Sequence, residues 1–420
     1  MTNYKTKAVM VYDYGTFVGL SERLARDFGK VYYYSPWKSS FPQTKNSYLG
    51  LGLKNVERVN EFFDYIQDVD LIVFPDVMDG DLQLHLESLG CSVFGCRKGE
   101  ELELNRLATK RLLKKLGLPV GEYEVVKGLT NLRKYLKEHK NIWVKVDIFR
   151  GDFETFKSVN YDFIEPRLYE IEVNLGPIKE LVNFICEEDL PDKVELGFDG
   201  YCIDGKYPTK TLSGIEVKDL GYIGIFKDYN KLPDPILEVN EKLSPILKNY
   251  GYRGLFSTEV RIGKDHKGYL IDPCMRAGSP PNEVYQEMYT NLSEIMYEGA
   301  RGNIVDPIVE HKFAVEVLIH STYAETHWLS VQVPEKYYNN VKFRNCTRLD
   351  KVHYIIPQYI GLPEIGAVTV VGDSIEACTE QIDKIADEVK GFYIDIPSHA
   401  LDKANEEIDK LKELGYDLFK

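Results

Sequence analysis

The chain has 420 residues, of which 44% are apolar and 28% charged, and its formal net charge is −14. This length and composition predict roughly two to four folded domains and exclude a disordered or fibrous polymer. The acidic excess argues against a nucleic-acid or membrane-surface binder, but permits a polyphosphate ligand held by a few placed lysines and arginines. The seven cysteines form no CxxC pair, and we find neither a run of about 20 apolar residues nor a secretory leader. We therefore expect a cytoplasmic protein with reduced thiols.

The first hundred residues alternate strand-like and helix-like segments. Apolar strand patterns occur at 7–14, 30–35 and 70–76, and amphipathic helical patterns at 20–28 and 82–90. Short apolar strands joined by helices are typical of βαβ units, so residues 1–98 predict an α/β domain with a parallel sheet.

Residues 99–304 predict a second unit with two lobes. A long helix near 100–117 ends at Gly117 and is followed by Pro119, a common stop pattern. The expected elements after it are a strand at 122–126, a helix near 129–139, a strand at 141–149, a strand-rich region at 190–226, a helix near 234–250 and a hairpin within 254–281. An apolar run is followed by acidic residues and Pro191, and this pattern indicates a linker between the lobes near 185–190.

The composition changes after about residue 305, toward short strands and one clear helix. In that helix the apolar side chains recur at three- and four-residue intervals behind an Asp373–Ser374 cap, at Ile375, Cys378, Ile382, Ile385 and Val389. Residues 305–420 therefore predict a small, strand-rich C-terminal domain.

The hairpin within 254–281 carries two acids that we expect to face each other. With strands 256–262 and 269–274 paired symmetrically, Glu259 lies opposite Asp272, whereas Val260 faces Ile271 and Ile262 faces Tyr269 on the apolar side. Carboxylates directly opposite one another repel, so they call for a cation or a shared proton. Two carboxylates with substrate phosphates are a usual magnesium arrangement. The alternative is a pair of solvated acids on an exposed face.

Arg276 and Gly278 follow the second acid in a predicted turn. This turn places a guanidinium beside the carboxylates, where it could clamp a phosphate or a carboxylate.

Lys145 lies in the middle of a strand pattern in which Ile142, Val144 and Val146 form the buried face. Burying an unpaired ammonium is costly, and a phosphate oxygen would satisfy it. The alternative is an edge-strand lysine that discourages pairing with other chains. The turn that follows, with Arg150 and Gly151, is a weak phosphate-loop signal, and Lys110 by itself is typical of a solvated helix residue.

The order of these pieces resembles the ATP-grasp superfamily over about residues 1–300. The matching features are Lys110 at a helix end, Lys145 before a glycine turn, the Glu187–Glu188 linker, Glu195, the acids Glu259 and Asp272, and Arg276. The resemblance implies an α/β class fold: an N-terminal pre-ATP-grasp domain with a parallel sheet, and two α+β lobes that grip ATP between antiparallel sheets. The length and the segment 366–396 are more specifically similar to phosphoribosylamine–glycine ligases, and the pattern also resembles ATP-grasp proteins carried by phages.

The resemblance also implies roles for these residues. Lys110 and Lys145 would bind ATP phosphates beneath the Arg150–Gly151 turn, residues 185–188 with Glu187 and Glu188 would contact the adenine, and Glu195 would contact the ribose. Glu259 and Asp272 would hold Mg²⁺, with Mn²⁺ as the alternative ion. Arg276 would contact the γ-phosphate or the acyl phosphate made from it, which makes Arg276 and Lys145 the expected catalytic residues.

Two departures limit the resemblance. The glycine-rich substrate motif of phosphoribosylamine–glycine ligases is replaced by YDYGTFVG at 12–19, and the usual Asn two residues after the second acid is Cys274, a poor magnesium ligand.

The expected function is an ADP-forming carboxylate–amine ligase that acts through an acyl phosphate on small-molecule or peptide substrates, as a monomer or homodimer. Three alternatives remain open at this stage: a true phosphoribosylamine–glycine ligase, a peptide- or protein-modifying ligase, and a nucleotide-binding protein without catalysis.

Overall fold

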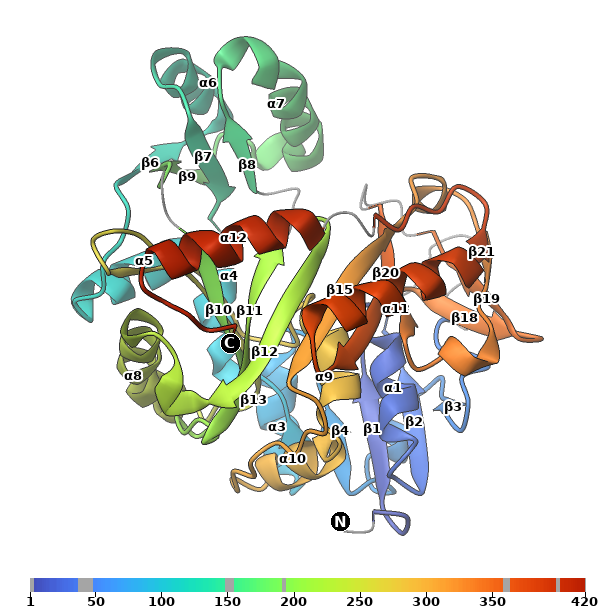
Figure 1. Ribbon diagram of the computed structural model, residues 1–420. Helices are drawn as coiled ribbons and strands as arrows, with labels where there is room; N and C mark the ends of the chain where they lie inside the picture. The colour runs from blue at the N-terminus through green and yellow to red at the C-terminus, as the bar shows by residue number, and fades with distance from the viewer. Residues whose placement is uncertain are drawn as a thin grey trace.

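The computed structural model describes residues 4–36, 48–147, 155–190, 194–357, 363–397 and 401–419. Its N-terminal part is a five-stranded, fully parallel sheet (Figure 1). The strand order is β3 (Glu57–Arg58), β2 (Lys30–Tyr34), β1 (Ala8–Tyr12), β4 (Leu71–Val73) and β5 (Val93–Phe94). The predicted helices occur as α1 (Val18–Leu24) and α3 (Gly80–Ser88), each shifted by about two residues toward the N-terminus. The α/β class and the parallel sheet are confirmed.

The single helix predicted near 100–117 is wrong, because the chain bends at Asn105. This residue leaves the helical region with φ −111° and ψ 75°, and separates α4 (Glu101–Leu104) from α5 (Arg106–Lys115). The Asn105 side chain accepts a hydrogen bond from the Ala108 amide at 3.2 Å. Asn competes with the backbone for hydrogen bonds and is a strong N-cap, so it starts a new helix here.

A small lobe follows, built on a four-stranded antiparallel sheet. Its strand order is β6 (Tyr123–Lys127), β9 (Asn183–Glu188), β7 (Ile142–Val146) and β8 (Thr155–Ser158), and its helices are α6 (Leu129–Glu138) and α7 (Tyr161–Leu175). Glu187 and Glu188 lie at the end of β9, paired with β6 and β7. The prediction that these acids belong to a linker is therefore wrong, since main-chain pairing continues to Glu188.

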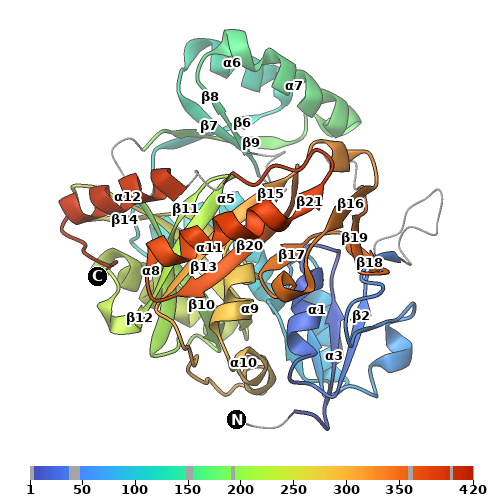
Figure 2. The same ribbon diagram turned by 45° about the vertical axis from the view of Figure 1, so that its right-hand side comes forward.

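An eight-stranded sheet forms the centre of the molecule. Its order is β14 (Gly268–Cys274), β13 (Arg253–Ile262), β10 (Val194–Ile203), β11 (Lys210–Val217), β12 (Gly221–Asp228), β15 (Phe313–His320), β20 (Glu364–Gly372) and β17 (Val341–Phe343). The last three strands belong to the segment after residue 305, so this segment extends the main sheet through the β12–β15 pairing. Figure 2 shows the small lobe above this sheet.

Three helices cover one face of the main sheet, namely α8 (Asp234–Asn249), α11 (Ile375–Glu388) and α12 (Leu401–Glu413), the last two crossing its front in Figure 1. Their apolar residues, such as Leu243, Ile382 and Leu411, pack with Phe198 and Ile223 of the sheet into one core. Ser374 caps α11 by accepting a hydrogen bond from the Ala377 amide at 3.1 Å, as predicted.

The opposite face of the main sheet packs on the N-terminal part through α9 (Asn282–Met288) and α10 (Leu292–Gly299). A further four-stranded sheet completes the C-terminal part. Its order is β18 (Cys346–Leu349), β19 (Val352–Ile355), β16 (Leu329–Gln332) and β21 (Lys390–Gly391).

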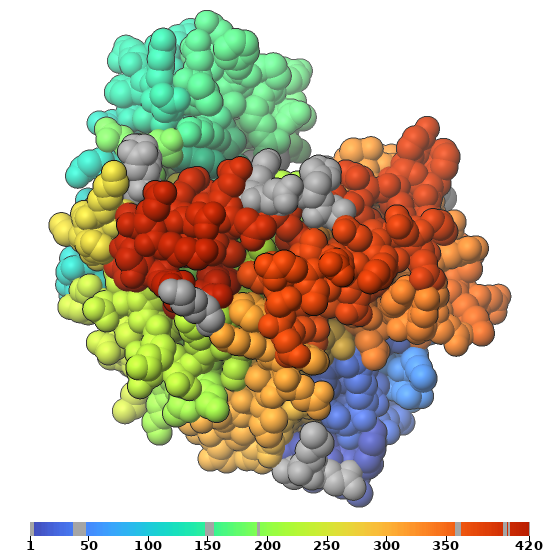
Figure 3. Space-filling model, in the orientation of Figure 1, coloured from blue at the N-terminus to red at the C-terminus, as the bar shows by residue number. Residues whose placement is uncertain are grey.

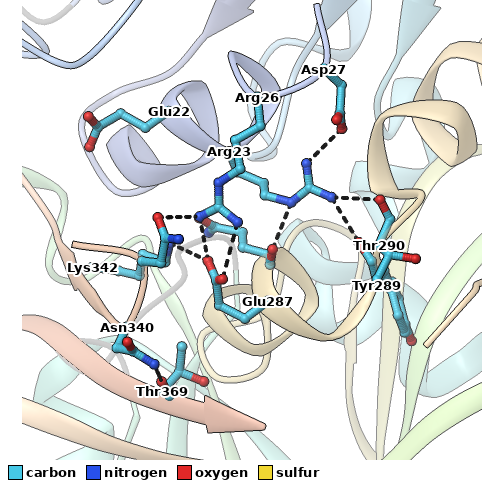
Figure 4. A network of polar contacts seen from close by, with 12 residues as sticks. Glu22, Arg23, Arg26, Asp27, Glu287, Tyr289, Thr290, Asn340, Lys342 and Thr369 are labelled. Atoms are coloured by element: carbon cyan, nitrogen blue, oxygen red, sulfur yellow. Dashed lines mark hydrogen bonds and ion pairs between the residues drawn. The ribbon is translucent and has the colours of Figure 1, made fainter. Parts of the chain in front are cut away.

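A buried ion network joins α1 to α9 and β17 (Figure 4). Glu287 on α9 accepts from Lys342 at 2.7 Å and from Arg26 at 2.7 Å. Arg26 follows the end of α1, and Arg23 within α1 donates to the main-chain carbonyls of Gln286 and Tyr289. The network therefore fixes the N-terminal sheet against the C-terminal part.

Each of the seven cysteines lies within the described residues, and none of them is in a disulfide. None of the helices within the described residues combines the length and the apolar character that a bilayer crossing demands.

Candidate active site

A cleft of about 1000 Å³ runs between the small lobe and the main sheet, along parts of β10, β11, β13 and β14 on the face that also packs on the N-terminal part. The small lobe projects from the rest of the molecule above this cleft (Figure 3). Side chains of both lobes line it, together with Thr16 of the N-terminal part and Arg344 and Glu364 of the C-terminal part. All three predicted units therefore contribute to one site.

Lys145 lies in this cleft, and its side chain is only 6% exposed. Its Nζ donates to Asp272 Oδ2 at 3.0 Å and lies 3.9 Å from Glu187 Oε1. Burial alone would lower the pKa of Lys145, but the two carboxylates outweigh it and hold this pKa above its usual value. The edge-strand alternative is wrong, because β7 is paired on both sides, with β8 and β9.

Lys110 also points to this site, from helix α5. Its Nζ lies 2.9 Å from Glu187 Oε2, and its side chain is 10% exposed. The solvated reading of this residue is therefore wrong. Glu187 lies between the two lysines, and a carboxylate in that position keeps two buried ammonium groups compensated.

The predicted hairpin pairs Glu259 with Asp272, so this part of its register is confirmed. The remaining pairs are wrong: a bulge after Glu259 places Val260 opposite Leu270 and Ile262 opposite Gly268. The bulge inserts one extra residue into β14, so both Ile271 and Asp272 line the cleft. Both acids line the cleft, and the side chain of Asp272 keeps 38% exposure there while it pairs with Lys145.

The two acids differ in their electrostatics. Burial and the nearby Glu195, Glu216 and Asp272 raise the pKa of Glu259 well above its usual range. Burial also acts to raise the pKa of Asp272, but Lys145 and Arg106 outweigh it and lower this pKa. Within the described ranges, no group of three or more His, Cys, Asp and Glu side chains is arranged to hold a metal ion.

Arg276 lines the cleft, held by carboxylates that the sequence did not point to. Its Nε lies 2.9 Å from Glu103 Oε1 and 3.8 Å from Asp76 Oδ1. Glu103 also accepts from the Met275 amide at 2.8 Å, so it fixes the turn after β14. Glu195, at the start of β10, is paired with Arg261 at 3.0 Å.

Three glycines lie side by side on the floor of the cleft, in the register Gly197, Gly214, Gly224 across β10, β11 and β12. The Tyr222 ring crosses them: a Cβ on Gly214 would lie 2.1 Å from its Cζ, and one on Gly224 2.6 Å from its Cε1. The Tyr222 hydroxyl donates to Asp199 Oδ2 at 2.6 Å. Burial raises the pKa of Asp199 to about 7, although this hydrogen bond opposes the rise.

Solved structures share this architecture over almost the whole chain. Phosphoribosylamine–glycine ligase from Thermotoga maritima matches with a TM-score of 0.68 and 17% identity, over 93% of this chain and 98% of that one. The biotin carboxylase domain dimer of Hydrogenobacter thermophilus 2-oxoglutarate carboxylase, in complex with MgADP, ADP and bicarbonate, gives 0.65 and 13%, over 98% of both chains. L-amino acid ligase from Bacillus licheniformis gives 0.59 and 15%, over 92% of this chain and 98% of that one. The chain has the ATP-grasp fold.

In sequence, no family model and no curated protein matches this ATP-grasp chain. The predicted ATP-grasp architecture is confirmed at the level of the fold. Two residues predicted to bind nucleotide, Arg150 and Gly151, lie outside the described residues. Glu188 lines the cleft beside Glu187, and its amide donates to the Glu122 carbonyl at 3.0 Å.

Sequence reasoning missed Glu103, Asp199 and Tyr222. Asp199 had a usable signal, because it follows Glu195 and Gly197 at two-residue spacing and so shares their face of β10. Tyr222 lies within the glycine-rich run DLGYIGI, where small neighbours leave room for a ring. Glu103 had no local signal, because its partner Arg276 is far away in the sequence.

Proposed function

We propose that this protein is an ADP-forming carboxylate–amine ligase that uses ATP and forms an amide through an acyl phosphate. The observation that carries the proposal is the Lys145–Asp272 ion pair of 3.0 Å across the cleft, with Glu259 directly opposite Asp272. A buried cation from one lobe and paired acids from the other form a site suited to a metal-bound triphosphate.

The proposed reaction has two steps. A carboxylate oxygen of the substrate attacks the γ-phosphorus of ATP, the bond to the β-phosphate oxygen breaks, and ADP leaves. The amine nitrogen then attacks the carbonyl carbon, the bond to the phosphate oxygen breaks, and inorganic phosphate and a proton are released. Such chemistry requires positioning and charge neutralisation and no protein nucleophile.

Lys110, Lys145 and Arg276 supply the positive charge in this proposal. Lys110, Lys145, Arg150 and Gly151 would bind phosphate oxygens, and Arg276 would contact the γ-phosphate or the acyl phosphate. Glu187 and Glu188 would lie at the adenine, and Glu195 at the ribose. Glu187 now pairs with both lysines, so bound phosphates would take over part of its role.

Glu259 and Asp272 fit a magnesium ion that arrives with the nucleotide, with manganese as the alternative. Burial and the neighbouring carboxylates raise the pKa of Glu259, and a bound cation would offset that repulsion. Two carboxylates are too few for a free ion but sufficient when phosphate oxygens complete the shell. When bound, the ion would neutralise charge on the transferring phosphoryl group.

We further infer small-molecule or peptide substrates and a cytoplasmic monomer or homodimer. The seven cysteines are in no disulfide, which supports the cytoplasm. The acidic net charge of −14 supports the absence of nucleic-acid and membrane partners.

A screen for ADP release tests the proposal. The purified protein is incubated with ATP and Mg²⁺ and with mixed pools of acids and amines, and ADP should form only when an active acid and amine are both present. Binding of MgATP without ADP release from any pool would favour the alternative of a nucleotide-binding protein without catalysis. The residue that supports this alternative is Cys274, a poor magnesium ligand at the position of the usual Asn.

The fold similarity to phosphoribosylamine–glycine ligase supports a second candidate. ADP release that depends on glycine and phosphoribosylamine would establish it. Co-purification of an acceptor polypeptide that gains mass in an ATP-dependent reaction would instead identify a protein-modifying ligase.

A further inference from the structure

The end of the cleft formed by residues 324–365 has a charge pattern unlike that around Lys145. Arg344 is the one basic side chain among the described residues that line this end, where Glu325 and Glu364 also lie. The guanidinium donates through Nη1 to Glu364 and through Nη2 to Ser279. Its charge is therefore already paired with one carboxylate.

Further carboxyls converge on this arginine from other elements. Glu216 and Glu316 share one face of the main sheet, because Glu216 pairs with Tyr222, and Tyr222 pairs with Glu316, across β11, β12 and β15. Glu216 and Tyr222 line the cleft, so Glu316 points to the cleft side of the sheet. Glu283 approaches from α9, close enough to affect the titration of Glu316 and Arg344.

The carboxyl oxygens here lack donors. Glu316 is 0% exposed, and neither of its carboxyl oxygens has a hydrogen-bond partner among the described residues; Oε2 of Glu283, 3% exposed, also lacks one. Leaving buried polar atoms unpaired is costly, so such groups call for a ligand that donates. An acceptor-only carboxylate can be satisfied by N–H or O–H groups or by a cation.

The cations that face this group are too few to balance it. The charged groups packed around it are Glu216 and Lys218 of β11, Glu283 of α9, Glu316 of β15, Lys342 of β17, Arg344, and Glu364 of β20. Lys342 is committed to Glu287 at 2.7 Å, which leaves Arg344 and Lys218 against four acids. Burial raises the pKa of Glu316 and Glu283, as expected when positive charge is missing.

We propose that Glu216, Glu316 and Glu364, around Arg344, bind the ammonium group of a cationic co-substrate such as a diamine or a basic amino acid. This inference rests on the proposed function, because it assigns the amine of that reaction to a chemical class. An ammonium group has three donors and one positive charge, which matches the unpartnered oxygens and the missing cation. Glu216, Arg344 and Glu364 line the same cleft as Lys145, so one substrate can reach both ends, whereas Glu316 is buried and is not part of the lining.

Calorimetric binding of 1,4-diaminobutane to the full chain without nucleotide tests the proposal, with succinate at equal ionic strength as the probe of opposite charge. We expect the diamine to bind and succinate not to bind. Glu316→Gln and Glu364→Gln should each weaken the diamine at least tenfold. Glu325→Gln, an acid of the same cleft end outside the cluster, is the matched control and should leave the affinity within twofold.

A second readout separates charge recognition from a merely structural role. Burial raises the pKa of Glu316 and Glu283, and a bound ammonium group would lower it, so the wild-type protein should release protons on binding, seen as a dependence of the binding heat on the ionisation heat of the buffer. Glu316→Gln should reduce that release. Gln is nearly isosteric with protonated Glu, and the more exposed Glu364 provides an independent variant if Glu316→Gln does not fold.

The outcomes distinguish this inference from the proposed function. No diamine binding, unchanged affinity in both variants, or binding of succinate instead would overturn the ammonium subsite, whatever the ATP chemistry. Diamine binding that depends on Glu316 and Glu364, in a protein that fails to bind MgADP, would keep the subsite and overturn the ligase.

Discussion

Lys145 is the residue whose removal should affect nucleotide binding most. It is buried in the cleft and its ammonium faces Asp272 and Glu187, so replacing it removes the positive charge that lies between these two acids. We expect Lys145→Ala to weaken MgADP binding by roughly tenfold or more, since a charge-assisted hydrogen bond contributes about 1.5–3 kcal/mol.

The control for this variant is Lys157→Ala on the neighbouring strand β8, whose ammonium pairs with Asp189 and is 32% exposed. Its MgADP affinity, measured by calorimetry in parallel, should stay within about twofold of the wild type, as expected for an exposed pair. Near-unchanged affinity in Lys145→Ala would remove this lysine from the phosphate site.

Replacing Asp272 should affect the rate of turnover more than the affinity for nucleotide. Asn keeps the shape and can still accept from Lys145 Nζ, but it removes the negative charge proposed for the metal. Asp272→Asn should therefore lower the rate of ADP release by roughly a hundredfold, the scale of one lost electrostatic contact in a reacting site. Its ADP affinity should change only a few-fold. Equal losses in rate and affinity would argue against a metal role.

Single residues were predictable from sequence where strand alternation decided their placement. Lys145 and the Glu259–Asp272 pair follow from the two-residue period of their strands. Lys110 was not predictable in this way, because its direction depends on the break at Asn105. The Arg276–Glu103 contact of 2.9 Å joins residues far apart in the chain, and no local pattern reports it.

Gly214 on strand β11 lies directly beneath the ring of Tyr222. Its missing Cβ leaves space for Tyr222, whose atoms would be 2.1 and 2.2 Å from that carbon. Tyr222 is 2% exposed and its hydroxyl is fixed on Asp199, so it cannot swing away. Gly214→Ala should therefore destabilise the protein by about 1–3 kcal/mol, as overpacking does.

The measurement is urea-induced unfolding, compared with Tyr222→Ala and the double variant. If the ring is the cause, the double variant should be no less stable than Tyr222→Ala alone, because removal of the ring relieves the clash. Additive losses would place the strain elsewhere in the sheet.

Helices and strands were predictable where residue propensity and apolar periodicity agreed. They were misplaced where pairing or packing with another element determined their position. The parallel strands and α11 with its Ser374 cap follow from local sequence. The β14 bulge does not, because one extra residue becomes visible only when two strands pair. Two helices were not predicted from the sequence. Helix α7 contains Pro166, which is unusual inside a helix. Helix α12 is mostly polar, and its apolar side becomes evident only from the sheet that it covers.

At the scale of the molecule, Glu287 ties the N-terminal sheet to the C-terminal part. It pairs with Lys342, which is buried, and with the more exposed Arg26. Glu287→Ala should cost about 3–5 kcal/mol, because breaking a buried pair leaves one charge uncompensated. Arg26→Ala is the matched control and should cost at most about 1 kcal/mol.

Denaturant unfolding of both variants provides the comparison. If the two variants lose the same free energy of unfolding, the loss comes from the exposed Arg26 contact. The charge of Lys342 is then compensated by a group other than Glu287. The contacts of this network join segments that lie more than 250 residues apart in the chain, such as Arg26 and Glu287.

The pH dependence of stability follows from the buried acids of the whole molecule. Burial raises the pKa of Asp13 and Asp199 to about 7, and that of Glu216 to about 8. The folded chain therefore keeps protons that the unfolded chain releases above pH ~4. The free energy of unfolding should fall as pH rises from about 5 to 8 and level off above it, by an amount on the order of a few kcal/mol.

Thermal unfolding of Asp199→Asn, which can still accept from Tyr222, should show a flatter profile, whereas Asp350→Asn on the surface should follow the wild type. A wild-type profile that rises between pH 5 and 8 would mean that these carboxyls are ionised in the folded protein, with cations facing them that the described residues do not supply.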